Sequence, residues 1–222
     1  MNNNLTEIVF ILDRSGSMAG LEADTIGGYN SLLEKQKKEA GQAIVSTVLF
    51  DDRQEVIHDR VVLDKINPIT DKEYYVRGCT ALLDAVGGAI HHIGNVHKYA
   101  REEDRPAKTL FIITTDGMEN ASKRYSYDKV KQMVERQKKK YGWDFLFLGA
   151  NIDAIEVAGR FGIGANSAVN YQCDETGTEL IYKVLNKAVT NVRMCAAKCT
   201  AEVLNDSWKS EIEEDYSKRH GR

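Results

Sequence analysis

The chain has 222 residues, and its 30 basic and 33 acidic side chains give it a formal net charge of −3. This length suits one α/β domain with at most a small extension, and nothing in the charge balance suggests a nucleic-acid-binding protein, which would usually show a concentrated basic face. The longest apolar runs are too short to span a membrane, so neither nucleic acid nor a membrane is an expected partner. The N-terminal segment lacks a basic region and a small-residue cleavage site, which predicts a cytoplasmic protein.

Apolar and β-branched runs predict the strands of a sheet. They occupy residues 5–12, 43–50, 54–63, 108–116 and 143–150, with a weaker candidate at 167–171. The three residues between the second and third runs are enough for an antiparallel hairpin. The run at 108–116 is apolar almost throughout, as expected of a strand covered on both faces.

Helical patterns lie between these strands. Apolar residues recur at helical spacing over residues 21–38, 81–98, 126–140, 153–161 and 176 to about 205. Strands that alternate with helices indicate an α/β fold with a doubly wound, mostly parallel sheet, here with one antiparallel edge strand. We expect one domain over residues 1–205, followed by a charged segment, 206–222, that forms either an amphipathic helix or a frayed tail.

The cysteines and the paired histidines give little sign of a zinc site. The spacings of the four cysteines match no zinc ribbon or finger. Cys195 and Cys199 continue the apolar stripe of the last long helix, which predicts that both are packed in the core. His91 and His92 are adjacent on a helix and therefore point in different directions, so we expect one to be partly packed and the other exposed.

Oxygen-bearing side chains follow the predicted strands at one edge of the sheet. Asp13, Ser15 and Ser17 follow the first strand, Asp116 ends the strand at 108–116, and Thr80 precedes the second helix. Ligands of doubly wound folds bind at the carboxyl ends of the strands. Two carboxylates and three hydroxyls form a hard donor set that suits Mg²⁺, with Mn²⁺ or Ca²⁺ as alternatives, better than zinc. Because few of these ligands are charged, we expect a bound metal to attract a carboxylate from outside.

Each of these residues also has a simpler interpretation. Aspartate and serine around Gly16 suit a turn or a helix N-cap, and Thr80 could cap the helix that starts at Ala81. Asp116, before a glycine, could be a turn residue. The adjacent residues Asp51 and Asp52 are expected to form the hairpin turn, and Glu119 is expected at the surface.

Three motifs carry a resemblance to a known family. "DRSGSM" at the end of the first strand, "GCTALLDAV" before the second helix and "IITTDGMEN" after the later strand resemble, in order and spacing, the von Willebrand factor type A (VWA) domains. The resemblance covers about residues 5 to 200 and is greatest to small, free-standing bacterial and phage members. It implies a Rossmann-like three-layer sandwich with an intact metal-ion-dependent adhesion site (MIDAS).

The resemblance also implies roles for the five residues. Ser15 and Ser17 would bind the metal directly, Asp13 mostly through water, and Asp116 directly or through water. Thr80 would bind directly when a partner is present and move back otherwise. The open coordination position would take a carboxylate from the partner. The expected protein is thus a non-catalytic, monomeric module that binds an acidic residue of a partner protein through the metal.

A second class of function has a weaker basis. An aspartate at the end of a first strand with Mg²⁺ nearby is similar to phosphoryl-transfer enzymes of the haloacid-dehalogenase or receiver type. The former need a second aspartate where this chain has Ser15, and the latter need an acidic pair that this chain lacks. No other nucleophile or general base is evident, so this function remains the alternative.

Overall fold

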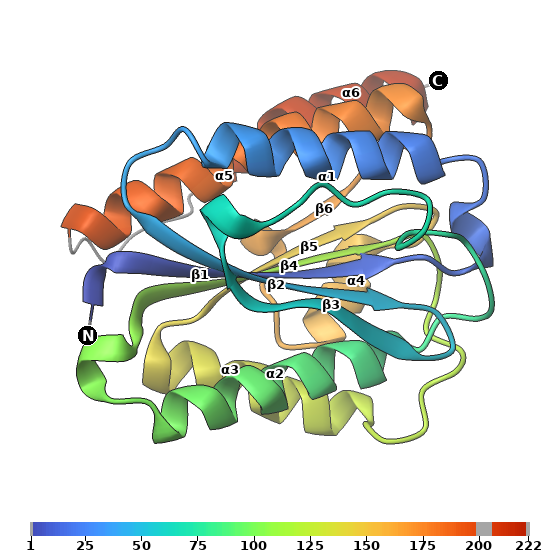
Figure 1. The fold of residues 1–222 in the computed structure, drawn as a ribbon. Helices are drawn as coiled ribbons and strands as arrows, with labels where there is room; N and C mark the ends of the chain where they lie inside the picture. Colours follow the sequence, from blue (N-terminus) through green and yellow to red (C-terminus); the bar gives the residue numbers. More distant parts are fainter. Residues whose placement is uncertain (1, 199–205, 221–222) are drawn as a thin grey trace.

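A single sheet of six strands forms the centre of the molecule (Figure 1). The structure is a computed structural model, and it describes residues 2–198 and 206–220. The strands lie in the order β3-β2-β1-β4-β5-β6, and only β3 is antiparallel to its neighbour. Their bounds are β1 Asn2–Asp13, β2 Gln42–Phe50, β3 Gln54–Val62, β4 Pro106–Thr115, β5 Asp144–Gly149 and β6 Ala168–Asn170.

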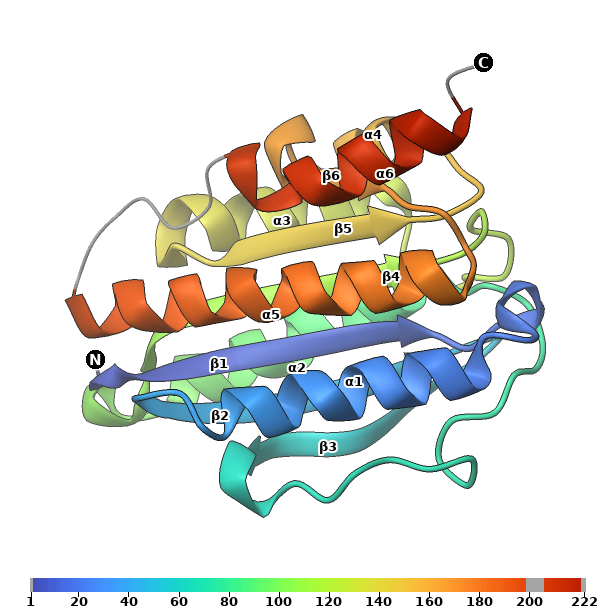
Figure 2. The same ribbon diagram turned by 90° about the horizontal axis from the view of Figure 1, so that it is seen from above.

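Helices cover both faces of this sheet and complete three layers (Figures 1 and 2). One face carries α1 (Glu22–Gln36), α5 (Glu175–Lys198) and α6 (Ser210–His220), and the other carries α2 (Leu82–Tyr99), α3 (Tyr127–Tyr141) and α4 (Ala154–Arg160). Short 3-10 turns, η1 to η5, occupy Gly16–Met18, Leu63–Lys65, Glu102–Asp104, Ala165–Ser167 and Asp206–Lys209. The predicted doubly wound sheet with one antiparallel edge strand is confirmed.

The side chains of β1 point alternately to the two faces of the sheet and so contribute to two separate layers of the core. Ile8, Phe10 and Leu12 of β1 pack with α1 and α5, whereas Val9 and Ile11 pack with α2 and α3. Successive residues of a strand point to opposite faces of its sheet, so a continuous apolar run fills both layers. The site-bearing end of β1 is therefore fixed by packing on both sides.

The C-terminal segment is helical where the structure describes it. Within η5 and α6, which pack against α5 and β6, the buried ammonium of Lys209 donates to the carbonyls of Ala165 (2.8 Å) and Ala168 (3.0 Å). The indole of Trp208 donates to the carbonyl of Asn166 at 2.8 Å. These contacts fix the segment against the sheet edge at β6.

Two predictions about individual side chains were wrong. Cys195 is only half-buried, although Val192 and Arg193 just before it are buried; Cys199 lies outside the described residues. His91 and His92 are both exposed, and His92 pairs with Asp59 at 2.8 Å. No helix in the described part of the chain is long and apolar enough to cross a membrane.

Candidate metal site

Three loops meet at the carboxyl edge of the sheet, where the strand order reverses. β1 pairs with β2 on one side and β4 on the other, and helices begin on opposite faces there. The first loop follows Asp13, the second carries Thr80 and the third follows Thr115. This reversal point is where doubly wound folds form a crevice for ligands.

Asp13 is buried at the end of β1 and both of its carboxylate oxygens accept hydrogen bonds. Oδ1 accepts from the amide of Ser15 at 2.7 Å, and Oδ2 accepts from the hydroxyl of Thr115 at 2.6 Å and the amide of Asp116 at 3.4 Å. Burial raises the pKa of Asp13, and these hydrogen bonds only partly offset the effect. A nearby cation would therefore relieve the cost of ionising this carboxyl group.

Three hydroxyl groups gather beside this carboxylate. Ser15 Oγ lies 3.1 Å from Ser17 Oγ, and it accepts a hydrogen bond from Thr80 Oγ1, also at 3.1 Å. Hydroxyl hydrogen bonds are usually shorter, at about 2.7–2.8 Å. Oxygens on adjacent corners of an Mg²⁺ octahedron, with bonds of about 2.0–2.1 Å, are about 2.9 Å apart. The observed spacing is close to that of cation ligands.

Thr80 is held in this position by the third loop. Its amide donates to Asn120 Oδ1 at 2.9 Å, and its carbonyl accepts from the amides of Asn120 (3.0 Å) and Ala121 (3.2 Å). The structure corrects the interpretation of Thr80 as a helix cap: α2 begins at Leu82 without a side-chain cap. The Thr80 hydroxyl instead faces Ser15.

The third loop is tied to the start of α2 by two carboxylates. Glu119 accepts from the amide of Leu83 and the hydroxyl of Ser122, each at 2.8 Å. Asp84 accepts from the amides of Arg124 and Tyr125, each at 2.9 Å. Glu119 therefore satisfies a free helix amide, which corrects its expected role as a surface residue.

Asp116 is buried across from Asp13, and two residues that the motifs do not include hold its carboxylate. Asn151, at a positive φ of 54°, donates to Oδ1 at 2.5 Å, and the thiol of Cys173 donates to Oδ2 at 3.0 Å. Burial, with Asp116 nearby, raises the pKa of the Cys173 thiol and keeps it protonated as a donor. Both residues follow strands, β5 and β6, so the strand-end rule could have found them.

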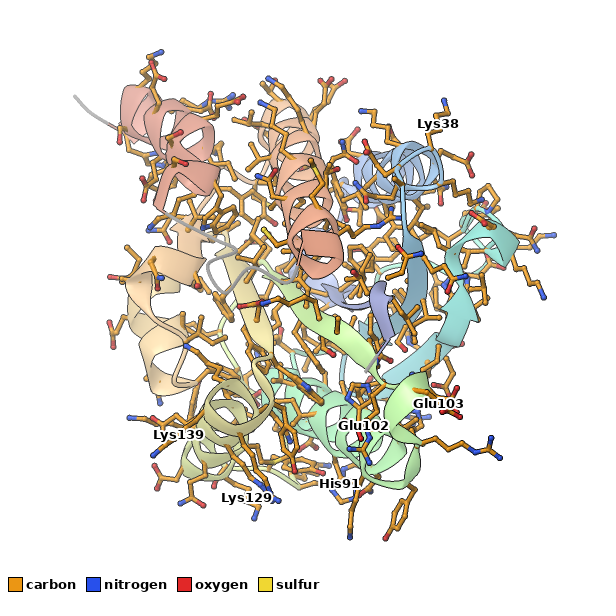
Figure 3. The ribbon with its side chains drawn as sticks, turned by 90° about the vertical axis from the view of Figure 1, so that its left-hand side faces the viewer. Lys38, His91, Glu102, Glu103, Lys129 and Lys139 are labelled. Atoms are coloured by element: carbon orange, nitrogen blue, oxygen red, sulfur yellow. The ribbon has the colours of Figure 1, made fainter. Side chains whose placement is uncertain are left out.

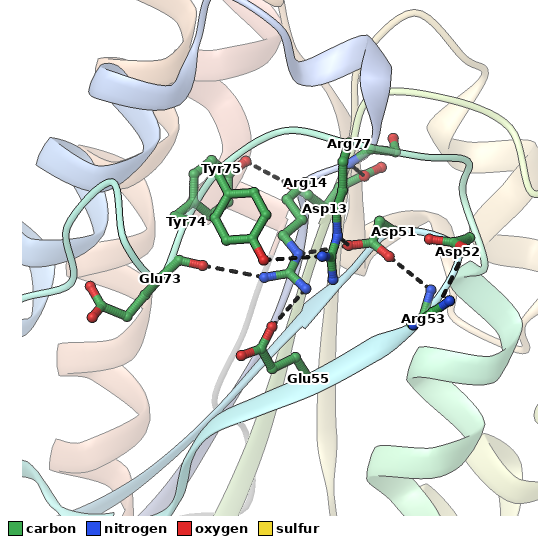
Figure 4. A network of polar contacts seen from close by, with 11 residues as sticks. Asp13, Arg14, Asp51, Asp52, Arg53, Glu55, Glu73, Tyr74, Tyr75 and Arg77 are labelled. Atoms are coloured by element: carbon green, nitrogen blue, oxygen red, sulfur yellow. Dashed lines mark hydrogen bonds and ion pairs between the residues drawn. The ribbon is translucent and has the colours of Figure 1, made fainter.

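Arg14 lies fully buried behind the site (Figure 4). Its Nε and the Nε of Arg77 both contact Asp51 Oδ2 at 2.8 Å, and its Nη2 pairs with Glu55 at 2.8 Å. Burial alone would raise the pKa of Asp51, but hydrogen bonds led by that of Arg77 lower it to about 2. Asp51 is thus more than the expected turn residue: it is the buried anion between two arginines.

This network aligns the first two loops. The Arg77 amide donates to the Arg14 carbonyl at 2.9 Å, and the Gly16 amide donates to the Gly78 carbonyl at 3.2 Å. The Tyr74 hydroxyl donates to the carbonyl of Asp13 at 2.5 Å (Figure 4). The segment that leads to Thr80 therefore runs alongside the segment that carries Ser15.

The donor set fits a hard divalent cation. All five predicted residues, Asp13, Ser15, Ser17, Thr80 and Asp116, come together. A Cβ atom on Gly117 would lie 3.3 Å from Ser17 Oγ and 3.6 Å from Thr80 Oγ1, so the glycine keeps the space beside both hydroxyls open. Among the described residues, no group of three or more histidines, cysteines or carboxylates could hold a metal ion.

No protein-family model matches the sequence, and no curated protein matches it. Among solved structures, the chain is similar to proximal thread matrix protein 1 from the mussel byssus, with 14% identity and a TM-score of 0.56. It is also similar to the same protein described with a zinc-occupied MIDAS motif, with 15% identity and a TM-score of 0.56. Both alignments cover 85% of this chain and 47% of the other.

A further structure, the ArnB paralog VWA2 from Sulfolobus acidocaldarius, has 18% identity and a TM-score of 0.49, with 85% and 45% of the two chains covered. The chain thus spans about half the length of the solved chains it matches. At this identity, the likeness to the mussel protein shows the fold alone. It supports the VWA/Rossmann-like three-layer sandwich that the topology defines.

Proposed function

We propose that this protein is a non-catalytic module that binds a partner protein through a divalent cation held at the carboxyl edge of its sheet. The observation that carries the proposal is the convergence of three hydroxyls, with Ser15 Oγ 3.1 Å from each of the other two, and two buried carboxylates. Ser15, Ser17, Thr80, Asp13 and Asp116 would hold the ion. Mg²⁺ is the proposed metal, with Mn²⁺ and Ca²⁺ as alternatives. The mussel protein with a zinc-occupied MIDAS motif supports a divalent ion in this fold.

The chain's own residues support capture of an acidic partner. A bound cation supplies a Lewis-acid position for an external carboxylate. The ligands contribute mostly neutral hydroxyls, and both oxygens of Asp13 are already hydrogen-bonded within the protein. Ser17 is exposed, and so is Met118, with 62% of its surface accessible. The site therefore faces solvent on a side that a partner can reach.

The same contacts give no support to phosphoryl transfer. The hydrogen bonds from Ser15, Thr115 and Asp116 orient the Asp13 carboxylate toward the protein's own donors, and none of these three residues is a general base. Ser15 also occupies the position where phosphatases of this type need a second aspartate. A phosphatase assay with Mg²⁺ should therefore find no turnover above that of the Asp13→Asn variant.

Affinity capture from the native cell tests the proposal. Wild-type protein in Mg²⁺ should retain a partner that EDTA releases and that Asp13→Ala fails to retain. Asp52→Asn is the matched control, because its carboxylate is half exposed and lies outside the site. Retention of the same partner in EDTA and by Asp13→Ala would show that the metal plays no part in the interaction.

A further inference from the structure

A positively lined groove lies between α2 and α3, away from the candidate metal site. Two adjoining hollows of about 300 and 360 Å³ share Gly94, Lys98, Gln137 and Tyr141 in their walls. Leu82 begins α2 beside the metal site, and Lys98 lies near the other end of this helix. At about 1.5 Å per residue, the two are about 24 Å apart along the helix axis. The groove therefore could hold a ligand of its own.

The groove gathers positive charge without a compensating carboxylate. No aspartate or glutamate lines either hollow, and the basic side chains there, apart from His97, are His91, Lys98, Arg105, Lys129, Arg136 and Lys140. Within the described part of the chain, none of these six has an acidic partner within 4.0 Å. Only the remaining basic residue, His97, is paired, with Glu7. In a chain with a net charge of −3, such clustering creates a local attraction for anions.

The two helices place these charges on one side of the molecule. α2 and α3 pack against each other, and His91 and Lys129 lie on the same outer side of this helix pair (Figure 3). The neighbouring acidic residues Glu102 and Glu103, on η3, do not line the hollows. The positive charge thus faces solvent and is accessible to a ligand.

A buried acceptor within the groove also lacks a partner. Gln137 is nine-tenths buried, lines both hollows, and its Oε1 has no hydrogen-bond partner among the described residues. Because Oε1 is itself covered, Gln137 contributes to the groove as part of its floor, behind the charged side chains. The half-exposed ring of Tyr141 forms part of the same wall, and the ammonium of Lys140 lies over it, 5.2 Å from the ring centroid.

We propose that this groove binds a small anion that carries two or more phosphate groups. Lys98 and Arg136 would hold the phosphates, because guanidinium and ammonium groups are their usual partners. A nucleotide and an inorganic polyphosphate share this chemistry. The proposal is independent of the metal site.

Calorimetric titration with tripolyphosphate and with ATP tests the proposal. It is run in EDTA on the whole chain, so that no cation can bridge the phosphates to the metal site. We expect one ligand per chain, with an affinity that falls as salt rises. The double variant Lys98→Gln, Arg136→Gln should bind at least about tenfold more weakly, which is about 1.4 kcal/mol.

The matched control is the double variant Lys131→Gln/Lys139→Gln. It also removes two positive charges, but from positions of α3 that do not line the groove. It should bind within about twofold of wild type. Tighter binding of ATP than of tripolyphosphate supports a nucleotide ligand, and equal binding supports recognition of the phosphate chain alone. The proposal is overturned if neither probe binds at millimolar concentration, or if the control weakens binding as much as the groove variant.

Discussion

Replacing Asp51 by asparagine should cost much of the protein's stability, because Asp51 neutralises a fully buried arginine. Asp51→Asn keeps the shape of the side chain but removes the charge that contacts Arg14 and Arg77 at 2.8 Å. Removing one member of a buried ion pair costs about 3–5 kcal/mol. Arg14 retains its ion pair with the half-exposed Glu55, so we expect the lower end, about 3 kcal/mol.

Thermal and urea unfolding in EDTA measure this loss. For a chain of this length, about 3 kcal/mol corresponds to a fall in Tm of about 6–12 °C. The control is Asp104→Asn, an exposed carboxylate of η3 that lies outside this network. It should change stability by less than about 0.5 kcal/mol. A loss below about 1 kcal/mol for Asp51→Asn would refute the importance assigned to the buried pair.

The same pair predicts a pH dependence. The folded protein lowers the pKa of Asp51 to about 2, below its value of about 3.9 in an unfolded chain. The stabilisation from this carboxylate is therefore complete above about pH 4 and is lost as the pH falls toward 2. The difference in stability between wild type and Asp51→Asn should shrink over that range. A constant difference would contradict the mechanism.

Three further changes test the site and its support. Metal affinity measured by titration should fall on acidification as the buried carboxyl of Asp13, with its raised pKa, takes up a proton; no change down to the ordinary pKa of aspartate would contradict this. Gly117→Ala should weaken metal binding with little change in Tm, because its Cβ approaches the site hydroxyls. In α1, Gly28→Ala should lower Tm, since its Cβ would lie 2.2 Å from the ring of Tyr182, whereas Gly27→Ala, with open space around it, should not.

Much of the fold could be predicted because it depends on local patterns. Apolar runs and helical spacing identify all six strands and the helices up to residue 198. A continuous apolar run also shows that helices must cover both faces of the strand, since its successive side chains point to opposite faces. The strand-end rule placed Asp13, Thr80 and Asp116 at one edge. Their proximity in the structure confirms that placement, while their role as metal ligands stays a prediction.

The support around the site could not be predicted in the same way. Arginine is rarely buried without a partner, and nothing near Arg14 in sequence reveals that Asp51 lies beside it. The strand-end rule could place Asn151 and Cys173 at the same edge as Asp116, but nothing in the sequence shows that their side chains donate to its carboxylate. Such contacts depend on how loops pack after folding, which periodicity does not record.

The central claim is that the three hydroxyls and two carboxylates hold a divalent cation. Calorimetric titration of the metal-free chain with Mg²⁺ and Mn²⁺ tests it most directly. Wild type is compared with the double variant Ser15→Ala/Ser17→Ala and with Ser31→Ala, an exposed serine of α1 that serves as the control. We predict one ion per chain for wild type and Ser31→Ala, and at least about a tenfold loss of affinity in the double variant. Equal affinity in all three proteins, or no binding at millimolar metal, would contradict the account.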